Sequence, residues 1–165
     1  MTLTPQKPST APRLPRELVS STSFLLKRLG MAVKERAGSE YEASGFSPYH
    51  HAVLSVLDES PRETQGAIAD ALGYDRGQLV GILDELEERG LVERKRDPSD
   101  RRRHTVSLTA EGKRDLGRLR RLARRMDEAF LDPLDADERA RLHELLLRLA
   151  EVHEPRCKGL MPPPK

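Results

Sequence analysis

The stretch Asp97-Pro98-Ser99-Asp100-Arg101-Arg102-Arg103 decides the fold of this chain. It is an acidic turn with a proline, followed directly by three arginines, and it lies between two short strand-like stretches, residues 91–94 (LVER) and 105–108 (TVSL). Two such stretches on either side of a turn predict a β-hairpin. The tip of this hairpin would be positively charged. An arginine at the tip can enter a narrow minor groove of DNA, where negative potential is concentrated.

Two short helical patterns, separated by a glycine turn, precede the hairpin. Thr64 can cap the first, and Gly73 ends it at a position that favours the left-handed conformation. Asp75 begins the second. Asp75 and Gln78 have the spacing of a capping box, in which each side chain bonds the backbone N–H of the other. The residues expected to face inward are Ile68 and Leu72 in the first helix and Leu79, Ile82, Leu83 and Leu86 in the second.

Further helices on either side of this region complete a mainly α fold, a winged helix-turn-helix with six helices and a two-stranded wing. A first helix is expected from residue 16 to about residue 35, with a loop at residues 38–45. Ser47-Pro48 begins the second helix, Thr109 caps a long fifth helix, and the sixth begins near Asp135. Apolar residues at helical spacing are Leu18, Leu25, Leu29 and Val33 in the first helix, Ala52, Val53, Val56 and Leu57 in the second, Leu116, Leu119, Ala123, Met126 and Phe130 in the fifth, and Leu142, Leu145, Leu146, Leu149 and Val152 in the sixth.

The distribution of charge is more informative than the net charge of +2. Residues 89–125 contain fourteen basic and five acidic side chains, a local excess of nine positive charges. This asymmetry indicates a polyanionic partner. For the arginines of the fifth helix the preferred interpretation is a solvated helix face; they are Arg118, Arg120, Arg121, Arg124 and Arg125.

Cysteine content and hydropathy favour a protein of the cytoplasm, associated with the nucleoid. Cys157 is the single cysteine, so no internal disulfide can form, and this is typical of a reducing compartment. No apolar run approaches the roughly 20 residues of a membrane span. The N-terminal residues are rich in proline and threonine and lack the apolar core of a signal peptide.

A helix-turn-helix inserts its second helix into the major groove, with the N-terminal residues nearest the base edges. In that segment Arg76 can bond the O6 and N7 atoms of guanine, and Gln78 can pair with adenine. Gly77 and Gly81 leave room for the DNA backbone, although Gly81 could instead pack against another helix. The later part of the helix is expected to point away from phosphate because it is acidic; its residues are Asp84, Glu85, Glu87 and Glu88.

Two segments resemble the MarR (multiple antibiotic resistance regulator) family: residues 79–94, LVGILDELEERGLVER, and residues 97–114, DPSDRRRHTVSLTAEGKR. The shared features are the Asp-x-Arg wing, a strand that ends in Leu-Thr, and a glycine shortly after the start of the next helix. The resemblance covers residues 16–152. It implies a bacterial homodimer that binds a palindromic operator on double-stranded DNA and is often released by a small phenolic or anionic effector.

Residues 1–15 are rich in proline, threonine and serine and are expected to form a flexible tail. The resemblance implies a division of the chain that follows, in which residues 16–46 would be a first helix and loop for dimerisation. Residues 47–109 would form the DNA-binding lobe. The helices at residues 110–154 would complete the dimer interface, with a tail at residues 155–165.

By motif position, Arg102 would be the minor-groove arginine and Asp100 the residue that orients it. Arg101 and Arg103 would be phosphate contacts or solvated neighbours. The complete set of candidate DNA-binding residues is Thr64, Asp75, Arg76, Gly77, Gln78, Gly81, Arg94, Lys95, Asp100, Arg101, Arg102 and Arg103.

The resemblance also implies an effector pocket where the first, second and fifth helices meet the DNA-binding lobe. The residues expected to contact an effector in this pocket are Lys27, Arg28, Tyr49, His50 and His51. His51 stands where relatives commonly carry a large hydrophobic residue, and the preferred interpretation is a hydrogen-bonded packing residue rather than a ligand contact.

Other functional classes are less favoured by the sequence. Enzyme motifs such as a P-loop, a dinucleotide-binding turn, a nucleophile elbow or HExxH do not occur, and no cofactor is expected. A metal-responsive regulator is disfavoured because the histidines lack His-x-x-x-His spacing. A redox-responsive regulator is disfavoured because Cys157 lies in a proline-rich tail. The remaining alternative is a winged helix that serves as a protein-interaction module.

Overall fold

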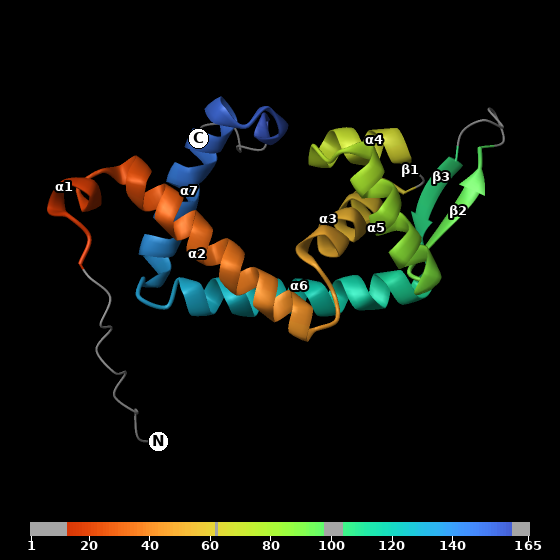
Figure 1. The fold of residues 1–165 in the computed structure, drawn as a ribbon, viewed down its shortest axis with the longest axis horizontal. Coiled ribbons are helices and arrows are strands. Elements are labelled where there is room, and N and C mark those ends of the chain that lie inside the picture. Colours follow the sequence, from red (N-terminus) through yellow and green to blue (C-terminus); the bar gives the residue numbers. More distant parts are fainter. Residues whose placement is uncertain (1–12, 62, 98–103, 160–165) are drawn as a thin grey trace, which may run out of the picture. The chain divides into compact units, whose positions relative to one another are not determined.

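The computed structural model describes residues 13–61, 63–97 and 104–159. The chain divides into two compact units, Met1–Arg36 and Ala37–Lys165. Within the described residues it is mainly helical, with seven α-helices, one 3-10 helix and a small antiparallel sheet (Figure 1). The predicted fold class, mainly α with a two-stranded wing, is confirmed.

The N-terminal unit contains α1 (Arg16–Val19) and the first part of α2 (Thr22–Ala43). The single helix predicted for residues 16–35 is therefore wrong. The chain breaks at two serines whose side chains bond the backbone: Ser20 Oγ donates to the Glu17 carbonyl at 2.7 Å, and Ser21 Oγ accepts from the Phe24 amide at 3.3 Å. Serine competes in this way with helical hydrogen bonds, which favours a helix end followed by a new start.

The loop predicted for residues 38–45 is also wrong over most of its length, because α2 continues to Ala43. Gly38 lies inside the helix, where a glycine is tolerated at a cost of about 1 kcal/mol relative to alanine. The last turns are held by Tyr41, which is buried in the core. The helix ends only where Gly45 adopts a positive φ of 77°. Tertiary packing of one tyrosine thus outweighs the local glycine signal.

In the C-terminal unit, α3 (Pro48–Glu59), α4 (Gln65–Leu72) and α5 (Arg76–Glu88) begin where the sequence predicted. Ser47 and Thr64 accept hydrogen bonds from backbone amides as N-caps, and Gly73 has the left-handed conformation with a φ of 65°. The capping box predicted for Asp75 and Gln78 forms only in one direction. Asp75 Oδ1 accepts from the Gln78 amide at 3.2 Å, whereas the Gln78 side chain is exposed.

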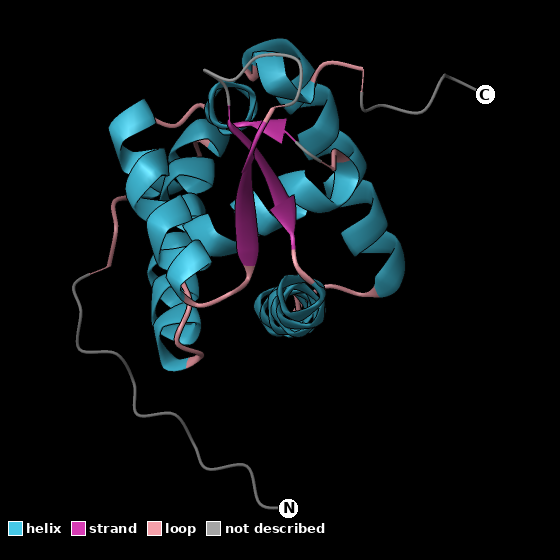
Figure 2. Cartoon of the chain, turned by 90° about the vertical axis from the view of Figure 1, so that its right-hand side faces the viewer, coloured by secondary structure: helices cyan, strands magenta, loops and turns pink. Residues whose placement is uncertain are grey.

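The sheet contains β1 (Glu63–Thr64), β2 (Val92–Arg96) and β3 (His104–Leu108), all antiparallel in the order β1-β3-β2. Figure 2 shows the three strands together in magenta. The hairpin register pairs Val92 with Leu108 and Arg96 with His104. The predicted hairpin is confirmed, and β1 is an additional short strand that the sequence analysis did not anticipate.

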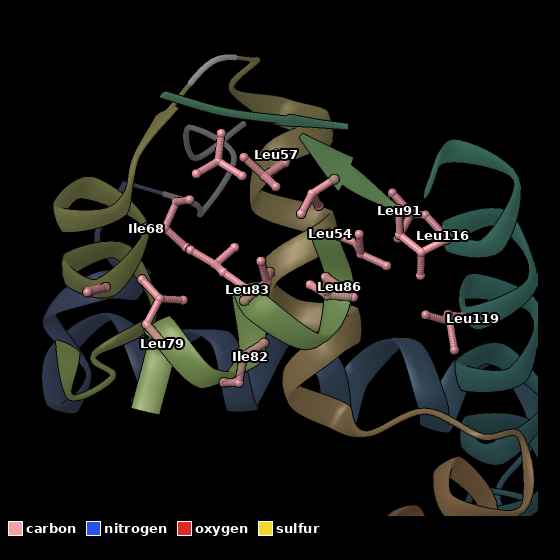
Figure 3. Packing of buried hydrophobic residues seen from close by; sticks show 14 of the residues in the cluster. Leu54, Leu57, Ile68, Leu79, Ile82, Leu83, Leu86, Leu91, Leu116 and Leu119 are labelled. Carbon is pink, nitrogen blue, oxygen red and sulfur yellow. The ribbon is translucent and has the colours of Figure 1, made fainter. Parts of the chain in front are cut away.

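The core lies between α3, α4, α5, the sheet and the first half of α6 (Ala110–Phe130) (Figure 3). All four inward residues predicted for α5 are buried. Leu116 and Leu119 of α6 are buried as well, but they pack into this core together with Leu122, which was not predicted. In the C-terminal half of α6 the predicted apolar residues Ala123, Met126 and Phe130 are only partly buried.

The chain continues into α7 (Ala136–His153), which Asp135 and Glu138 begin with a capping box, and ends in the 3-10 helix η1 (Pro155–Cys157). No residue of α7 is buried. Its exposed apolar side chains are Leu145, Leu146, Leu149 and Val152. Among the described residues, no helix is long and apolar enough to cross a membrane.

Candidate nucleic-acid interface

The N-terminal half of α5 exposes the residue types that were predicted to face DNA. Leu79 is buried in the core, whereas Arg76 and Gln78 are exposed. A Cβ added at Gly81 would meet no atom within 4 Å. Packing of Gly81 against another helix is therefore contradicted for the described residues. The arrangement leaves an exposed helical face with one arginine, one glutamine and two glycines.

Two residues of the predicted set act as helix caps in the structure. Asp75 Oδ1 accepts from the amides of Gly77 and Gln78, at 2.8 and 3.2 Å. Thr64 Oγ1 accepts from the Ala67 amide at 3.2 Å. Both side chains fix the start of a helix, so any contribution they make to binding includes the placement of α4 and α5.

The acidic half of α5 holds the base of the wing. Arg94 of β2 forms ion pairs with Asp84 and with Glu87, the latter at 3.5 Å from Nε to Oε2. The Arg94 amide also donates to Glu87 Oε1 at 3.1 Å. The Arg94 side chain is only 19% exposed, and this favours positioning of the wing over the predicted contact with DNA. Lys95, by contrast, is exposed and pairs with Glu93 at 2.7 Å.

The charged tip of the wing lies outside the described residues, and with it the predicted Asp100, Arg101, Arg102 and Arg103. The antiparallel strands that lead to the tip are described as far as Arg96 and His104, which are both exposed.

The predicted effector residues are divided between the two units. Lys27 and Arg28 are exposed residues of α2 in the N-terminal unit. In the C-terminal unit, three consecutive residues of α3 contact three different parts of the structure. Tyr49 meets the Tyr74 ring edge-on at 5.4 Å, His50 bonds Glu85 of α5, and His51 bonds Tyr41 of α2.

His51 is a partly buried, hydrogen-bonded residue, as the preferred interpretation expected. Its Nδ1 lies 2.6 Å from the Tyr41 hydroxyl. Burial lowers the pKa of His51, and the charge of Arg120 lowers it further. Burial raises the pKa of Tyr41, so its hydroxyl keeps its proton and can donate to a neutral imidazole. Tyr41 was not predicted because the sequence suggested a loop at its position.

The described residues contain no cluster of three His, Cys, Asp or Glu side chains that could hold a metal ion. Cys157 is partly buried in η1.

Comparison with known proteins agrees with this geometry. Residues 44–103 match the model of the MarR family. A putative transcriptional regulatory protein for the hcr operon of Thauera aromatica is 32% identical over 133 residues, which are 80% of each chain. The chain belongs to the MarR family.

Solved structures of other transcriptional regulators share the fold. The PcaV transcriptional regulator from Streptomyces coelicolor in complex with its natural ligand has a TM-score of 0.65 and 32% identity, over 86% of this chain and all of that chain. The repressor CouR bound to a 23-mer DNA duplex has a TM-score of 0.74 and 35% identity, over 85% of this chain and 99% of that chain. CouR from Rhodococcus jostii RHA1 bound to p-coumaroyl-CoA has a TM-score of 0.70 and 28% identity, over 86% and 97%.

These findings establish the general function. The chain is a DNA-binding transcriptional regulator of the MarR family with a winged helix-turn-helix, and this family consists of regulators rather than enzymes.

Proposed function

We propose that this MarR-family chain is a homodimeric repressor that reads a palindromic operator through α5 and the wing, and that a small aromatic anion releases it. The observation that carries the proposal is the two-sided character of α5. Its buried leucines fix the helix in the core, while Arg76, Gln78 and Gly81 remain exposed for contact with DNA. Two such helices in a symmetric dimer would read half-sites about one helical turn apart.

Exposed apolar side chains support the homodimer. Leu25, Leu29 and Val33, all predicted as the apolar side of the first helix, are 38–50% exposed. On α7 the apolar residues are similarly exposed, and a hollow of about 500 Å³ near its start is lined in part by Leu134, Leu142 and Leu145. A helix face with several exposed apolar side chains is rarely left in water. A second copy of the chain would cover it, because a symmetric interface joins identical patches.

The aromatic effector is inferred from the relatives. CouR binds p-coumaroyl-CoA, and PcaV was solved with its natural ligand. In this chain the partly buried His51, which is bonded to the buried Tyr41, and the nearby positive charge of Arg120 offer polar groups to an aromatic anion. An effector releases DNA only if it binds the two spacings of the reading helices with different affinity.

The test is selection of bound duplexes from a random DNA pool, followed by titration of the selected operator at several salt concentrations. We expect a palindromic sequence and a slope of log K against log salt of about −0.9 for each phosphate neutralised. Arg102→Ala should weaken binding and leave the dimer intact. Gln78→Ala should cost about 1–3 kcal/mol on the best operator and less on other sequences. Arg124→Ala, an exposed arginine of α6, is the matched control and should change neither property.

Each part of the proposal has a result that would contradict it. Unchanged operator affinity in Arg102→Ala would remove the wing from the proposal, and equal losses on all sequences in Gln78→Ala would remove base reading by that residue. A monomer in sedimentation would contradict the dimer. Selection without any enriched motif would favour a protein-interaction module.

The effector is tested by calorimetry with hydroxybenzoic and hydroxycinnamic acids, free and as coenzyme A esters. Binding of one of them should lower operator affinity. If none binds and the operator complex persists in the presence of all of them, the effector proposal is wrong.

A further inference from the structure

His50 is one of two buried polar side chains in the described part of the chain, with 6% of its surface exposed. Both of its ring nitrogens are bonded. The backbone N–H of Ser47 donates to Nδ1 at 3.1 Å, and Nε2 lies 3.0 Å from Glu85 Oε2. Since Nδ1 accepts a hydrogen bond, the proton of the neutral ring must be on Nε2, where it is donated to the carboxylate. The geometry therefore specifies one tautomer.

These two bonds connect two structural elements. Ser47 and His50 form the capping box that begins α3, in which the His50 amide also donates to Ser47 Oγ at 3.2 Å. Glu85 lies on α5, in the half of the helix that follows the exposed reading residues. One side chain thus completes the cap of α3 and holds α5 against it.

Arg89 makes a second connection at the same place. Its Nη1 donates to the Gly45 carbonyl at 2.9 Å, and its guanidinium carbon lies 3.9 Å from the centre of the Phe46 ring. The Phe46 ring meets the imidazole of His50 edge-on, with centroids 6.1 Å apart. The loop between α2 and α3 and the first turn of α3 therefore hold the end of α5 through two hydrogen bonds and one cation–π contact.

We propose that His50 is a positioning residue for DNA recognition, which sets the orientation of α5 through its hydrogen bond to Glu85. This proposal rests on the role of α5 as the reading helix. The physical basis is that α5, with thirteen residues, moves as a rigid helix. A small rotation of the helix about Glu85 therefore displaces the reading residues near its N-terminus. Such a displacement reduces contacts that depend on the position of base edges.

The protonation state of His50 belongs to the same arrangement. Burial lowers the pKa of His50 below its ordinary value, Glu85 opposes this shift, and the charge of Arg89 adds to it. A protonated ring has no acceptor for the Ser47 amide, so acidification removes one bond of the cap while the contact with Glu85 gains charge. The cap that places the ring beside Glu85 is weakened by this loss, so wild-type protein should lose operator affinity at acidic pH more steeply than a variant without the imidazole.

Three substitutions on α5 test the proposal with the full-length protein and its selected operator. Glu85→Ala removes the acceptor, Glu85→Gln keeps an acceptor without the charge, and Glu88→Ala removes a charge from an exposed residue of the same helix. We expect Glu85→Ala to bind the operator about five- to tenfold more weakly. Glu85→Gln should stay within about twofold of wild type. Glu88→Ala should bind as well as wild type or better, because it removes a negative charge near DNA.

All affinities are measured well below the unfolding temperature of every variant, so a loss of folded protein cannot imitate the effect. A second readout uses His50→Gln, whose operator affinity should depend less on pH between about 7.5 and 5.5 than that of wild type. If His50→Gln does not fold, the Glu85 series decides alone.

Equal operator affinity in Glu85→Ala and Glu88→Ala would overturn the proposal. Gln78→Ala, measured in parallel, separates this failure from failure of the underlying function. If Gln78→Ala weakens operator binding and Glu85→Ala does not, α5 reads DNA but His50 does not position it. If neither substitution has an effect, α5 is not the reading helix.

Discussion

Replacement of Gly112 by alanine should destabilise the junction between the wing and α6. Gly112 is the third residue of α6 and is buried. A Cβ at this position would lie 2.0 Å from the Leu91 carbonyl oxygen and 3.0 Å from its carbon. That carbonyl accepts a hydrogen bond from the Thr109 amide at 3.1 Å. Leu91 directly precedes β2, so the methyl group could be accommodated only by moving the start of the wing strand away from α6.

The magnitude follows from two opposing terms. Alanine inside a helix is favoured over glycine by about 1 kcal/mol. Overpacking of a well-packed site costs about 1–3 kcal/mol, and a contact with rigid backbone belongs at the upper end. Weakening of the Thr109–Leu91 hydrogen bond adds about 1 kcal/mol. The net loss in the free energy of unfolding should be about 2–3 kcal/mol, which lowers Tm by about 5–10 °C in a protein of this size.

Gly117→Ala on the same helix is the matched control. The nearest atom to its added Cβ would be the flexible end of Arg121 at 3.8 Å, so the helical gain should dominate and stability should rise by up to about 1 kcal/mol. Both variants are unfolded by urea and by heat at one protein concentration, because the stability of an oligomer depends on concentration. A Gly112→Ala protein as stable as Gly117→Ala would refute the close-contact reasoning.

Three further predictions concern the site. Gly81→Ala should stabilise the fold by up to about 1 kcal/mol but weaken operator binding; unchanged affinity in gel-shift titrations would show that the glycine does not face DNA. Arg94→Met should speed hydrogen exchange of the β2 amides and leave the salt slope of operator binding unchanged, whereas Lys95→Ala should reduce that slope by about one; a reduced slope in Arg94→Met would restore Arg94 as a phosphate contact. Burial lowers the pKa of both His50 and His51, so the folded state binds fewer protons than the unfolded state. The contribution of the two histidines to the free energy of unfolding is therefore complete above about pH 6.5 and is lost as the pH falls through their folded-state pKa values. Urea midpoints that stay constant from about pH 7 to about pH 5 would contradict this.

The features that could be predicted from the sequence are those encoded within one or two turns of chain. Asp75 and Gly73 mark the ends of α5 and α4 because capping and left-handed turns depend on local residue types. The buried stripe that begins at Leu79 follows from helical periodicity alone. For the same reason the exposure of Arg76 and Gln78 on α5 could be predicted from the sequence.

Errors arose where a local signal was overruled by packing. Gly38 is typical of a loop, yet α2 continues past it to Ala43 because Tyr41, one turn later, is buried in the core. The apolar spacing of α6 predicted a surface for helix packing but did not specify which residues would turn toward the core. Periodicity defines a face, and only the tertiary arrangement decides what that face contacts.

The polar contacts of α5 are separated in sequence by distances that no local pattern encodes. His50 and Glu85 are 35 residues apart, and Arg89 reaches Gly45 over 44 residues. Glutamates on an exposed helix face are ordinarily solvated, so nothing in the sequence distinguished Glu85 from Glu88. Arg94 was predicted to contact DNA, and its ion pairs with α5 became visible only in three dimensions.

The carboxylates in the second half of α5 also form structural contacts, in addition to keeping negative charge away from the phosphates of DNA. A helix that reads DNA must leave the polar side chains of its N-terminal half free, as Arg76 and Gln78 are exposed in α5. Its orientation must then be set by the other half, where carboxylates can accept bonds from both neighbours without competing for DNA. In this chain Asp84 and Glu87 hold the wing through Arg94, and Glu85 holds α3 through His50. The wing and α3 are thereby bonded to the same few turns of α5, so a movement of either neighbour acts directly on the helix that we propose as the reader of the bases.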